Sequence, residues 1–131
     1  MKKSGVLNDQ ISFVIASMGH MDMLTIGDAG LPVPLNVDKI DLALVPGIPT
    51  FLDVVRAVAN DLEVQEIVLA EEIKEHNPEI EAALKELFKG IQIIYMPHSE
   101  LKVLSAGSRA AIRTGECTPY ANVILVSGVT F

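Results

Sequence analysis

The sequence predicts an α/β fold of three layers, with helices on both faces of a central sheet that is mostly parallel or mixed. Segments typical of strands alternate with segments typical of helices, which is the pattern of a sheet covered on both faces. Some connections are too short for a parallel crossover, so part of the sheet is expected to be antiparallel. A length of 131 residues is that of one compact domain, and we expect a single domain over residues 1–131.

The first predicted element is a helix over residues 7–18. Apolar side chains recur there at helical spacing, Asn8 is a residue type that caps helix N-termini, and Gly19 ends the pattern. Residues 23–26 are predicted to form a short strand. This strand runs into residues 27–32, where two glycines and a proline exclude regular structure, so we expect a loop at its carboxyl end.

A second strand is predicted over residues 40–45, a largely apolar run closed by a Pro-Gly pair. Thr50 and Asp53 have the spacing of a helix start, and apolar side chains at helical spacing continue this helix to Leu62. Residues 66–69 then have the composition of a third strand. The order of the first five elements is therefore helix, strand, strand, helix, strand.

The next predicted helix covers residues 79–89. Asn77 is a suitable N-cap for it, Pro78 suits the first helical position, and Gly90 supplies the stop. A fourth strand follows over residues 91–96.

The last part of the chain is predicted to contain one short helix and two strands. Ser99 is a suitable cap for a helix that ends at Leu104, and residues 110–113 are predicted to form a short strand. After a loop over residues 115–122, the apolar run 123–126 predicts a last strand in the centre of the sheet. Ligands of such sheets gather at strand ends, so the polar loops there are the places to search for a site.

Composition excludes several classes of function. The net charge is −7 and the basic residues are scattered, so the sequence offers no basic surface that would bind nucleic acid. The single cysteine, Cys117, excludes an internal disulfide and the metal sites that need a second thiol. A mean hydropathy of +0.39 is high for a chain of this size, which predicts that apolar surface is buried between subunits.

Neither a leader peptide nor a membrane segment is expected. The basic pair Lys2-Lys3 is followed by residues 4–10, whose polar side chains break any apolar leader core. The apolar runs are one strand long, far short of the ~20 residues needed to span a bilayer. We therefore expect a protein of the cytoplasm.

Two of the three histidines are candidates for chemistry. His20 and His98 each occupy a loop beside an apolar element, and imidazole both donates and accepts protons near neutral pH. Either one could instead be a cap or a core histidine bonded to backbone. His76 lies in a charged stretch between Glu75 and Asn77, and we interpret it as a solvated surface residue.

Three further polar residues lie in loops beside predicted strands. Asp28 follows the first strand and could present its carboxylate to a ligand, although a turn aspartate bonded to its own backbone is the simpler interpretation. Its segment lacks both glycine-rich phosphate-binding patterns, so nucleotide binding is excluded. Tyr120 and Asn122 precede the last strand and offer hydroxyl and amide groups suited to sugar hydroxyls, or to ordinary turn chemistry.

Five short motifs connect these residues. They are Gly19-His20-Met21-Asp22, Ile26-Gly27-Asp28-Ala29-Gly30-Leu31-Pro32, Met96-Pro97-His98, Arg113-Thr114-Gly115-Glu116 and Tyr120-Ala121-Asn122-Val123. In their order, spacing and total length they resemble the D-ribose pyranase family over the whole chain. The related fucose mutarotases share the histidine and loop pattern, so the resemblance indicates the reaction type more firmly than the sugar.

The resemblance implies an isomerase that interconverts the pyranose and furanose forms of free D-ribose in ribose catabolism. It implies that His20 is the acid and that the sugar is held by Asp28, His98, Tyr120 and Asn122. Ring opening delivers a proton to the ring oxygen and withdraws one from the anomeric hydroxyl, and ring closure reverses both transfers. We therefore expect no metal and no other cofactor.

The distance between two of these residues raises a difficulty. An extended path from His20 to Asp28 spans roughly 25 Å at about 3.3 Å per residue, which is too far for one pocket. Either the chain bends sharply at Gly19 or Gly27, or a neighbouring subunit completes the site, and we favour the second. The resemblance also implies a homo-oligomeric ring, a pentamer or decamer, with sites near the subunit interfaces.

Two other functions remain open. A non-catalytic sugar-binding module of a ribose transport or regulatory system could use both histidines only to bond hydroxyls. A phosphohistidine carrier is the weaker alternative, because neither His20 nor His98 has an Arg or Lys within two residues.

Overall fold

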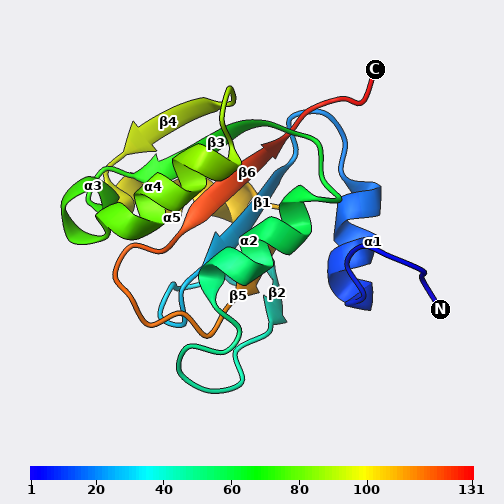
Figure 1. Ribbon diagram of the computed structural model, residues 1–131, viewed down its shortest axis with the longest axis horizontal. Helices are drawn as coiled ribbons and strands as arrows, with labels where there is room; N and C mark the ends of the chain where they lie inside the picture. Colours follow the sequence, from blue (N-terminus) through cyan, green and yellow to red (C-terminus); the bar gives the residue numbers. More distant parts are fainter.

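A six-stranded sheet with helices on both faces forms the protein, and the computed structural model describes all 131 residues (Figure 1). The strands are β1 (Met23–Gly27), β2 (Asp38–Asp41), β3 (Val64–Ala70), β4 (Gln92–Met96), β5 (Ala110–Arg113) and β6 (Val123–Ser127). The helices are α1 (Asp9–Ser17), α2 (Phe51–Ala59), α3 (Ile73–His76), α4 (Pro78–Leu87) and α5 (His98–Leu104), followed by the 3₁₀ turn η1 (Ser105–Gly107). No helix has the length and apolar character that crossing a membrane requires.

The sheet is mixed, as predicted, with the strand order β2-β5-β1-β6-β3-β4. β6 is antiparallel to both of its neighbours, β1 and β3, whereas all the other neighbouring pairs are parallel. Five strands therefore run in one direction and β6 alone runs in the other. As a result, the carboxyl ends of five strands and the amino end of β6 meet at one edge of the sheet. We call this the carboxyl edge.

Both faces of the sheet are covered, which confirms the three-layer prediction. Helices α1, α2 and α4 bury apolar side chains on one face, and the largest core cluster includes the fully buried Phe51 and Leu84. Figure 1 shows α2 and α4 lying across the front of the sheet. The opposite face has a smaller cluster in which Leu101 of α5 packs with Val68 and Ile124. Adjacent residues of β3 and β6 divide between the two clusters because strand side chains alternate.

The predicted starts of the first two helices are confirmed. The Asn8 side chain accepts a hydrogen bond from the backbone N–H of Ile11 at 2.9 Å, so it caps α1. The Thr50 side chain accepts one from the backbone N–H of Asp53 at 3.2 Å and caps α2 in the same way. These two helix starts are local features, which explains why sequence spacing was sufficient to find them.

The bounds predicted for the second strand are wrong. β2 covers Asp38–Asp41 rather than residues 40–45 because it lies at the edge of the sheet, and its single partner, β5, ends opposite Asp41. Beyond that point the chain turns back, and the backbone N–H of Leu44 donates to the carbonyl of Ile48 at 3.0 Å. The part of the apolar run after Asp41 is therefore a loop, in which Leu44 is 76% exposed.

The helix after β4 also differs from the prediction. α5 starts at His98, with Pro97 as the extended N-cap, so Ser99 is not the cap. The first backbone N–H of α5 donates to the side chain of Glu72, which is distant in sequence, so no local pattern predicts this contact. α3 was not predicted at all, because four residues are too few to show helical periodicity.

Candidate functional site

Four residues singled out from the sequence lie together at the carboxyl edge. Asp28 follows β1, His98 begins α5 just after β4, and Tyr120 and Asn122 immediately precede β6. The reversed direction of β6 brings its amino end to the edge where β1 and β4 finish. The topology thus collects residues that are far apart in sequence, and we call these four residues the edge cluster.

Asn122 is at the centre of the edge cluster. Its side chain is almost completely buried, with 1% of the residue exposed. Its Oδ1 accepts a hydrogen bond from the backbone N–H of Asp28 at 3.0 Å. Its Nδ2 lies 3.4 Å from Nε2 of His98. One buried amide therefore links the loop after β1 to the start of α5.

These two contacts determine the form of the His98 ring. The backbone N–H of Asp28 can only donate, so it fixes Oδ1 of Asn122 on that side and directs Nδ2, a donor, toward His98. Nε2 of His98 must then accept, which requires a neutral imidazole with its proton on Nδ1. At its backbone, the N–H of His98 donates to both carboxylate oxygens of Glu72, at 2.9 and 3.1 Å.

The surroundings of His98 favour the same neutral form. Burial of the half-buried ring, together with the positive charge of Lys102 one helical turn away, lowers the pKa of His98 from its ordinary value of 6.5. The carboxylates of Glu72 and Asp28 act in the opposite direction without reversing the shift. A neutral imidazole is therefore available at pH 7 as a hydrogen-bonding group.

We expect NMR titration of the native protein to give a His98 midpoint below 6.5, and titration in urea to return it to the ordinary value. A lowered native pKa means that the unfolded chain binds the proton more readily, so this group stabilises the fold above about pH 6.5 and loses that contribution as pH falls through its native pKa. A His98→Gln variant assigns the resonance. A native midpoint at or above the urea value would contradict the lowering of the His98 pKa by burial and Lys102.

Tyr120 packs against the His98 ring. The two ring centroids are 5.1 Å apart and the planes are nearly perpendicular, at 88°, which is the edge-to-face arrangement that aromatic pairs favour. The backbone of Tyr120 has a φ of 55°, in the left-handed region. The half-buried ring thus forms a wall of the edge cluster.

The loop that carries Asp28 is held by the last residue of β5 and by the segment that follows β5. The backbone N–H of Ala29 donates to the carbonyl of Glu116 at 2.8 Å, and Nε of Arg113 donates to the carbonyl of Ala29 at 2.9 Å. Oδ1 of Asp28 accepts from the N–H of Gly30 at 2.8 Å, which is the turn-aspartate arrangement considered from the sequence. Its Oδ2 has no hydrogen bond within the chain, so one carboxylate oxygen is left to accept from a ligand.

His20 does not join the edge cluster within one chain. It precedes β1, next to the end of β6, where the backbone N–H of Met21 donates to the carbonyl of Ser127. The five residues of β1 separate the two places by roughly 15 Å at about 3.3 Å per residue. His20 is exposed, and its Nε2 lies 3.0 Å from Oε1 of Gln65. No sharp bend brings it to Asp28, so the first of the two sequence-based explanations is wrong.

Two neighbours of the edge cluster were not identified as functional from the sequence. Glu72 was not singled out, although it binds the start of α5. His76 is exposed, as expected, but its ring lies 5.4 Å from the ring of Tyr120. Both contacts cross between segments distant in sequence, so no spacing rule predicts them.

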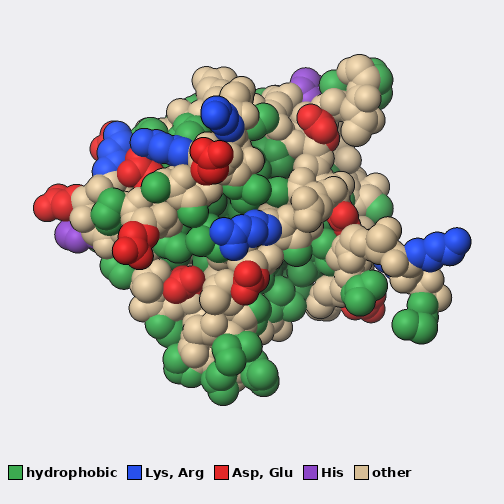
Figure 2. All heavy atoms as spheres, viewed as in Figure 1, with side chains coloured by type: hydrophobic (Ala, Val, Ile, Leu, Met, Phe, Trp, Pro, Cys, Tyr) green, Lys and Arg blue, Asp and Glu red, His purple; other side chains and the backbone are tan.

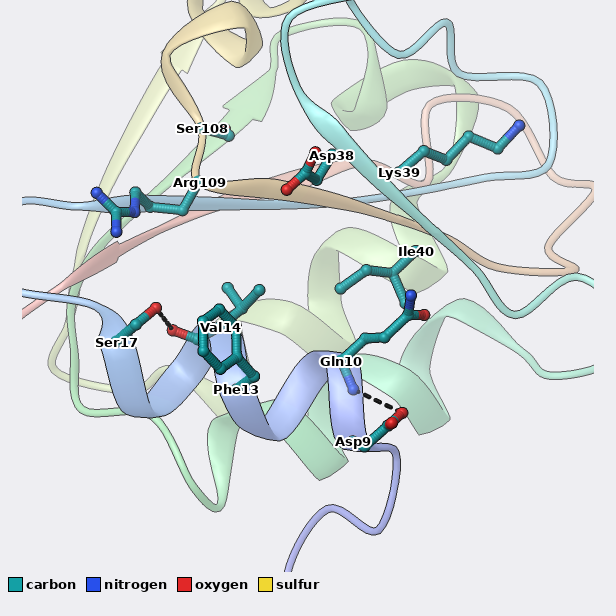
Figure 3. Close-up of a pocket in the computed structure, with 10 residues that line it drawn as sticks. All are labelled: Asp9, Gln10, Phe13, Val14, Ser17, Asp38, Lys39, Ile40, Ser108 and Arg109. Atoms are coloured by element: carbon teal, nitrogen blue, oxygen red, sulfur yellow. Dashed lines mark hydrogen bonds between the residues drawn. The ribbon is translucent and has the colours of Figure 1, made fainter.

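A large open pocket lies outside the edge cluster. It measures about 1010 Å³ and opens between α1 and the edge strand β2 (Figure 3). Charged and polar side chains line most of it: Asp9, Gln10, Ser17, Asp38, Lys39, Ser108 and Arg109, beside Phe13, Val14 and Ile40. None of the edge-cluster residues reaches it. No group of three His, Cys, Asp or Glu side chains in the structure could hold a metal ion.

Comparison with known sequences gives full-length matches. The chain matches the RbsD / FucU transport protein family over residues 1–130. A curated protein named D-ribose pyranase, from Lactobacillus gasseri, is 57% identical over 131 residues, which are 100% of both chains. A protein of the same name from Laribacter hongkongensis is 54% identical over the same length.

Two solved structures have the same fold. Bacillus subtilis RbsD complexed with D-ribose has a TM-score of 0.98 and 47% sequence identity, with 100% of both chains covered. A fucose mutarotase in complex with L-fucose, from Streptococcus pneumoniae, has a TM-score of 0.81 and 20% identity, with 95% of both chains covered. The second similarity establishes the fold only.

Proposed function

We propose that this chain, which belongs to the RbsD / FucU transport protein family, is a D-ribose pyranase that interconverts the pyranose and furanose forms of free D-ribose. The observation that carries the proposal is the edge cluster, in a chain whose full-length relatives bear that name and whose fold matches a protein complexed with D-ribose. We assign the whole of residues 1–131 to one pyranase domain.

The edge cluster suits a small polyol. Asp28 has a free carboxylate oxygen that can accept, and the neutral imidazole of His98 can donate from Nδ1. The Tyr120 side chain offers a hydroxyl group and an apolar ring surface. The Asn122 side chain is already bonded to Asp28 and to His98, so its main role is to hold these two residues in place. The second N–H of its amide can donate a hydrogen bond to the sugar. We propose these four residues as the ribose-binding site.

We propose His20 as the acid that protonates the ring oxygen. Ring opening moves one proton from His20 onto that oxygen and passes one from the anomeric hydroxyl to water or to the free carboxylate oxygen of Asp28. The oxidation state does not change, so the reaction needs neither a metal nor a redox cofactor. An exposed imidazole beside Gln65 is free to act on a molecule that approaches from outside the chain. The sugar then has to meet His20 and the edge cluster together.

A neighbouring subunit meets this requirement. If subunits join head to tail, His20 of one chain can face the edge cluster of the next, and repetition closes a ring. Exposed apolar side chains support association: Leu44, Val45 and Ile48 are each at least half exposed in the loop between β2 and α2, where Figure 2 shows a green projection at the lower end. We propose a pentameric or decameric ring located in the cytoplasm.

Light scattering is expected to give a mass several times 14.1 kDa. The side chains of the apolar loop supply part of the driving force, so changing Leu44 and Ile48 to Ser should lower the mass. A matched change of the exposed Leu7 and Val103 to Ser, away from that loop, should leave the mass unchanged. A wild-type monomer at micromolar concentration would refute the shared site.

Saturation-transfer NMR of D-ribose tests the proposed function. We expect pyranose–furanose exchange to become faster in proportion to the added protein. Saturable ribose binding with an unchanged exchange rate would instead identify a non-catalytic binding module, the alternative to which the transport description of the family also points. L-fucose, measured in parallel, tests sugar preference.

A further inference from the structure

Asn77, at the junction of α3 and α4, is bonded to the segment that leads into Tyr120. Its Nδ2 donates to Oγ1 of Thr118 at 3.0 Å and to the carbonyl of Pro119 at 2.9 Å. Asn77 is buried, with 8% of the residue exposed. Both donor positions of one buried amide are therefore used on the two residues immediately before Tyr120.

This use of Asn77 departs from the local rule. Asn77 is the N-cap of α4, a position where an asparagine normally accepts a hydrogen bond from the helix, as Asn8 does in α1. In α4 the cap makes no such bond, and the side chain faces the loop instead. Asn77 gives up the usual cap hydrogen bond and instead makes two hydrogen bonds to a distant loop. This indicates that the contact with the loop has a role other than starting α4.

Tyr120 has a conformation that needs support from its surroundings. Its φ of 55° is rare for a residue with a side chain, and such a conformation persists where neighbouring contacts fix it. Its ring is close to two histidine rings, with centroid distances of 5.1 Å to His98 and 5.4 Å to His76. His76 adjoins Asn77 in the sequence, so one short segment reaches both the backbone before Tyr120 and its ring.

We propose that Asn77 and His76 are positioning residues that hold Tyr120 in place for the sugar, Asn77 through the backbone at Thr118 and Pro119 and His76 through the ring. This inference rests on the proposed function in so far as Tyr120 contacts ribose. The arrangement itself is a property of the free protein. It can therefore be tested separately from ribose chemistry.

The main test is Asn77→Asp, which removes both donors and keeps a residue that caps helices well. The added negative charge at the start of α4 is compatible with the helix dipole, so α4 should remain intact. Losing two hydrogen bonds to the loop is expected to weaken ribose binding roughly 10-fold, while exchange at saturating ribose changes less. Asn8→Asp, the same change at the N-cap of α1, is the matched control and should leave binding unchanged.

NMR of the tyrosine ring protons supplies a readout that does not need ribose. The chain has two tyrosines and no tryptophan, so Tyr95→Phe leaves Tyr120 as the single tyrosine signal. In that background, Asn77→Asp should abolish the ring-current shifts that the two histidine rings impose on Tyr120. His76→Ala should remove part of them and weaken ribose binding roughly threefold, the scale of one aromatic contact.

The outcomes separate the two proposals. Unchanged Tyr120 shifts in a folded Asn77→Asp variant overturn the positioning role, whether or not the chain binds ribose or speeds its exchange. If Asn77→Asp alters the Tyr120 shifts but the wild-type chain neither binds ribose nor speeds its exchange, the positioning of Tyr120 is upheld and the proposed function is overturned. If Asn77→Asp does not fold, Thr118→Val at an exposed position removes one of the two acceptors, and normal shifts with normal ribose affinity in that variant overturn the inference.

Discussion

Replacing His20 by alanine is expected to slow pyranose–furanose exchange by about 10²–10⁴-fold, the usual contribution of a positioned general acid. The fold should survive, because the side chain is exposed and bonds only Gln65. Ribose binding should largely survive as well, because the edge cluster lies at the carboxyl edge and His20 lies at the opposite end of β1. Exchange is measured by saturation-transfer NMR and binding by calorimetry.

Two further variants sharpen this test. His20→Asn keeps a polar side chain but has no group that can be protonated near neutral pH, so it should be as slow as His20→Ala. Gln65→Ala keeps the imidazole and removes its hydrogen-bond partner, so its loss of rate should be much smaller. Wild-type exchange in His20→Ala would end the assignment of the acid.

A mixture of two impaired variants tests whether the site is shared. His20→Ala lacks the acid and Asp28→Asn lacks the binding carboxylate. When the two are co-expressed and mix at random in a ring, roughly a quarter of the sites pair an intact His20 with an intact Asp28 from the neighbouring chain. We therefore expect co-expression to restore part of the activity. Persistent inactivity in mixed rings would mean that both residues act within one chain.

Replacing Asn122 by alanine is expected to reduce ribose affinity by more than about 10²-fold and to destabilise the protein by about 2–4 kcal/mol. The change leaves the backbone N–H of Asp28 and Nε2 of His98 without their partner in a buried place. Affinity falls further because Asp28 and His98 lose the link between their segments. Calorimetry and urea unfolding measure the two effects, and Asn36→Ala, at an exposed asparagine with one hydrogen bond, is the control.

Asn122→Asp separates the two bonds of that amide. The new carboxylate still accepts from the backbone N–H of Asp28, but it faces His98 with an acceptor where the wild type has a donor. Protonated His98 is then favoured, so the NMR midpoint of His98 should rise above the wild-type value. An unchanged midpoint would show that the contact between Asn122 and His98 is absent in solution.

The sequence was informative where structure is decided locally. The caps Asn8 and Thr50 bond N–H groups three residues further along the chain, and the unbroken apolar run 123–126 has the composition of a buried strand, and each element is present. The bounds of β2 depend on where β5 ends, and the start of α5 depends on Glu72. Those partners are distant in sequence, so neither boundary could be found from a window of residues.

The same distinction applies to the site. His98, Asp28, Tyr120 and Asn122 were chosen because they are polar residues at strand ends, and the topology brings them together. That Asn122 bonds two of the others follows only from the antiparallel direction of β6, which strand composition does not encode. The separation of His20 from Asp28 did follow from sequence, because the length of a strand is set by its rise per residue.

The reversed strand β6 also governs how the chain must fold. β6 lies between β1 and β3 in the sheet but follows every other strand in the chain, so during synthesis it emerges after all the strands that it joins. Until then, β2, β5 and β1 can assemble only as one half-sheet, and β3 with β4 as another. Each half exposes the unpaired edge that β6 will occupy, which is a template for wrong pairing. These long-range contacts make folding slow, and the nascent chain is most prone to aggregation before β6 is available.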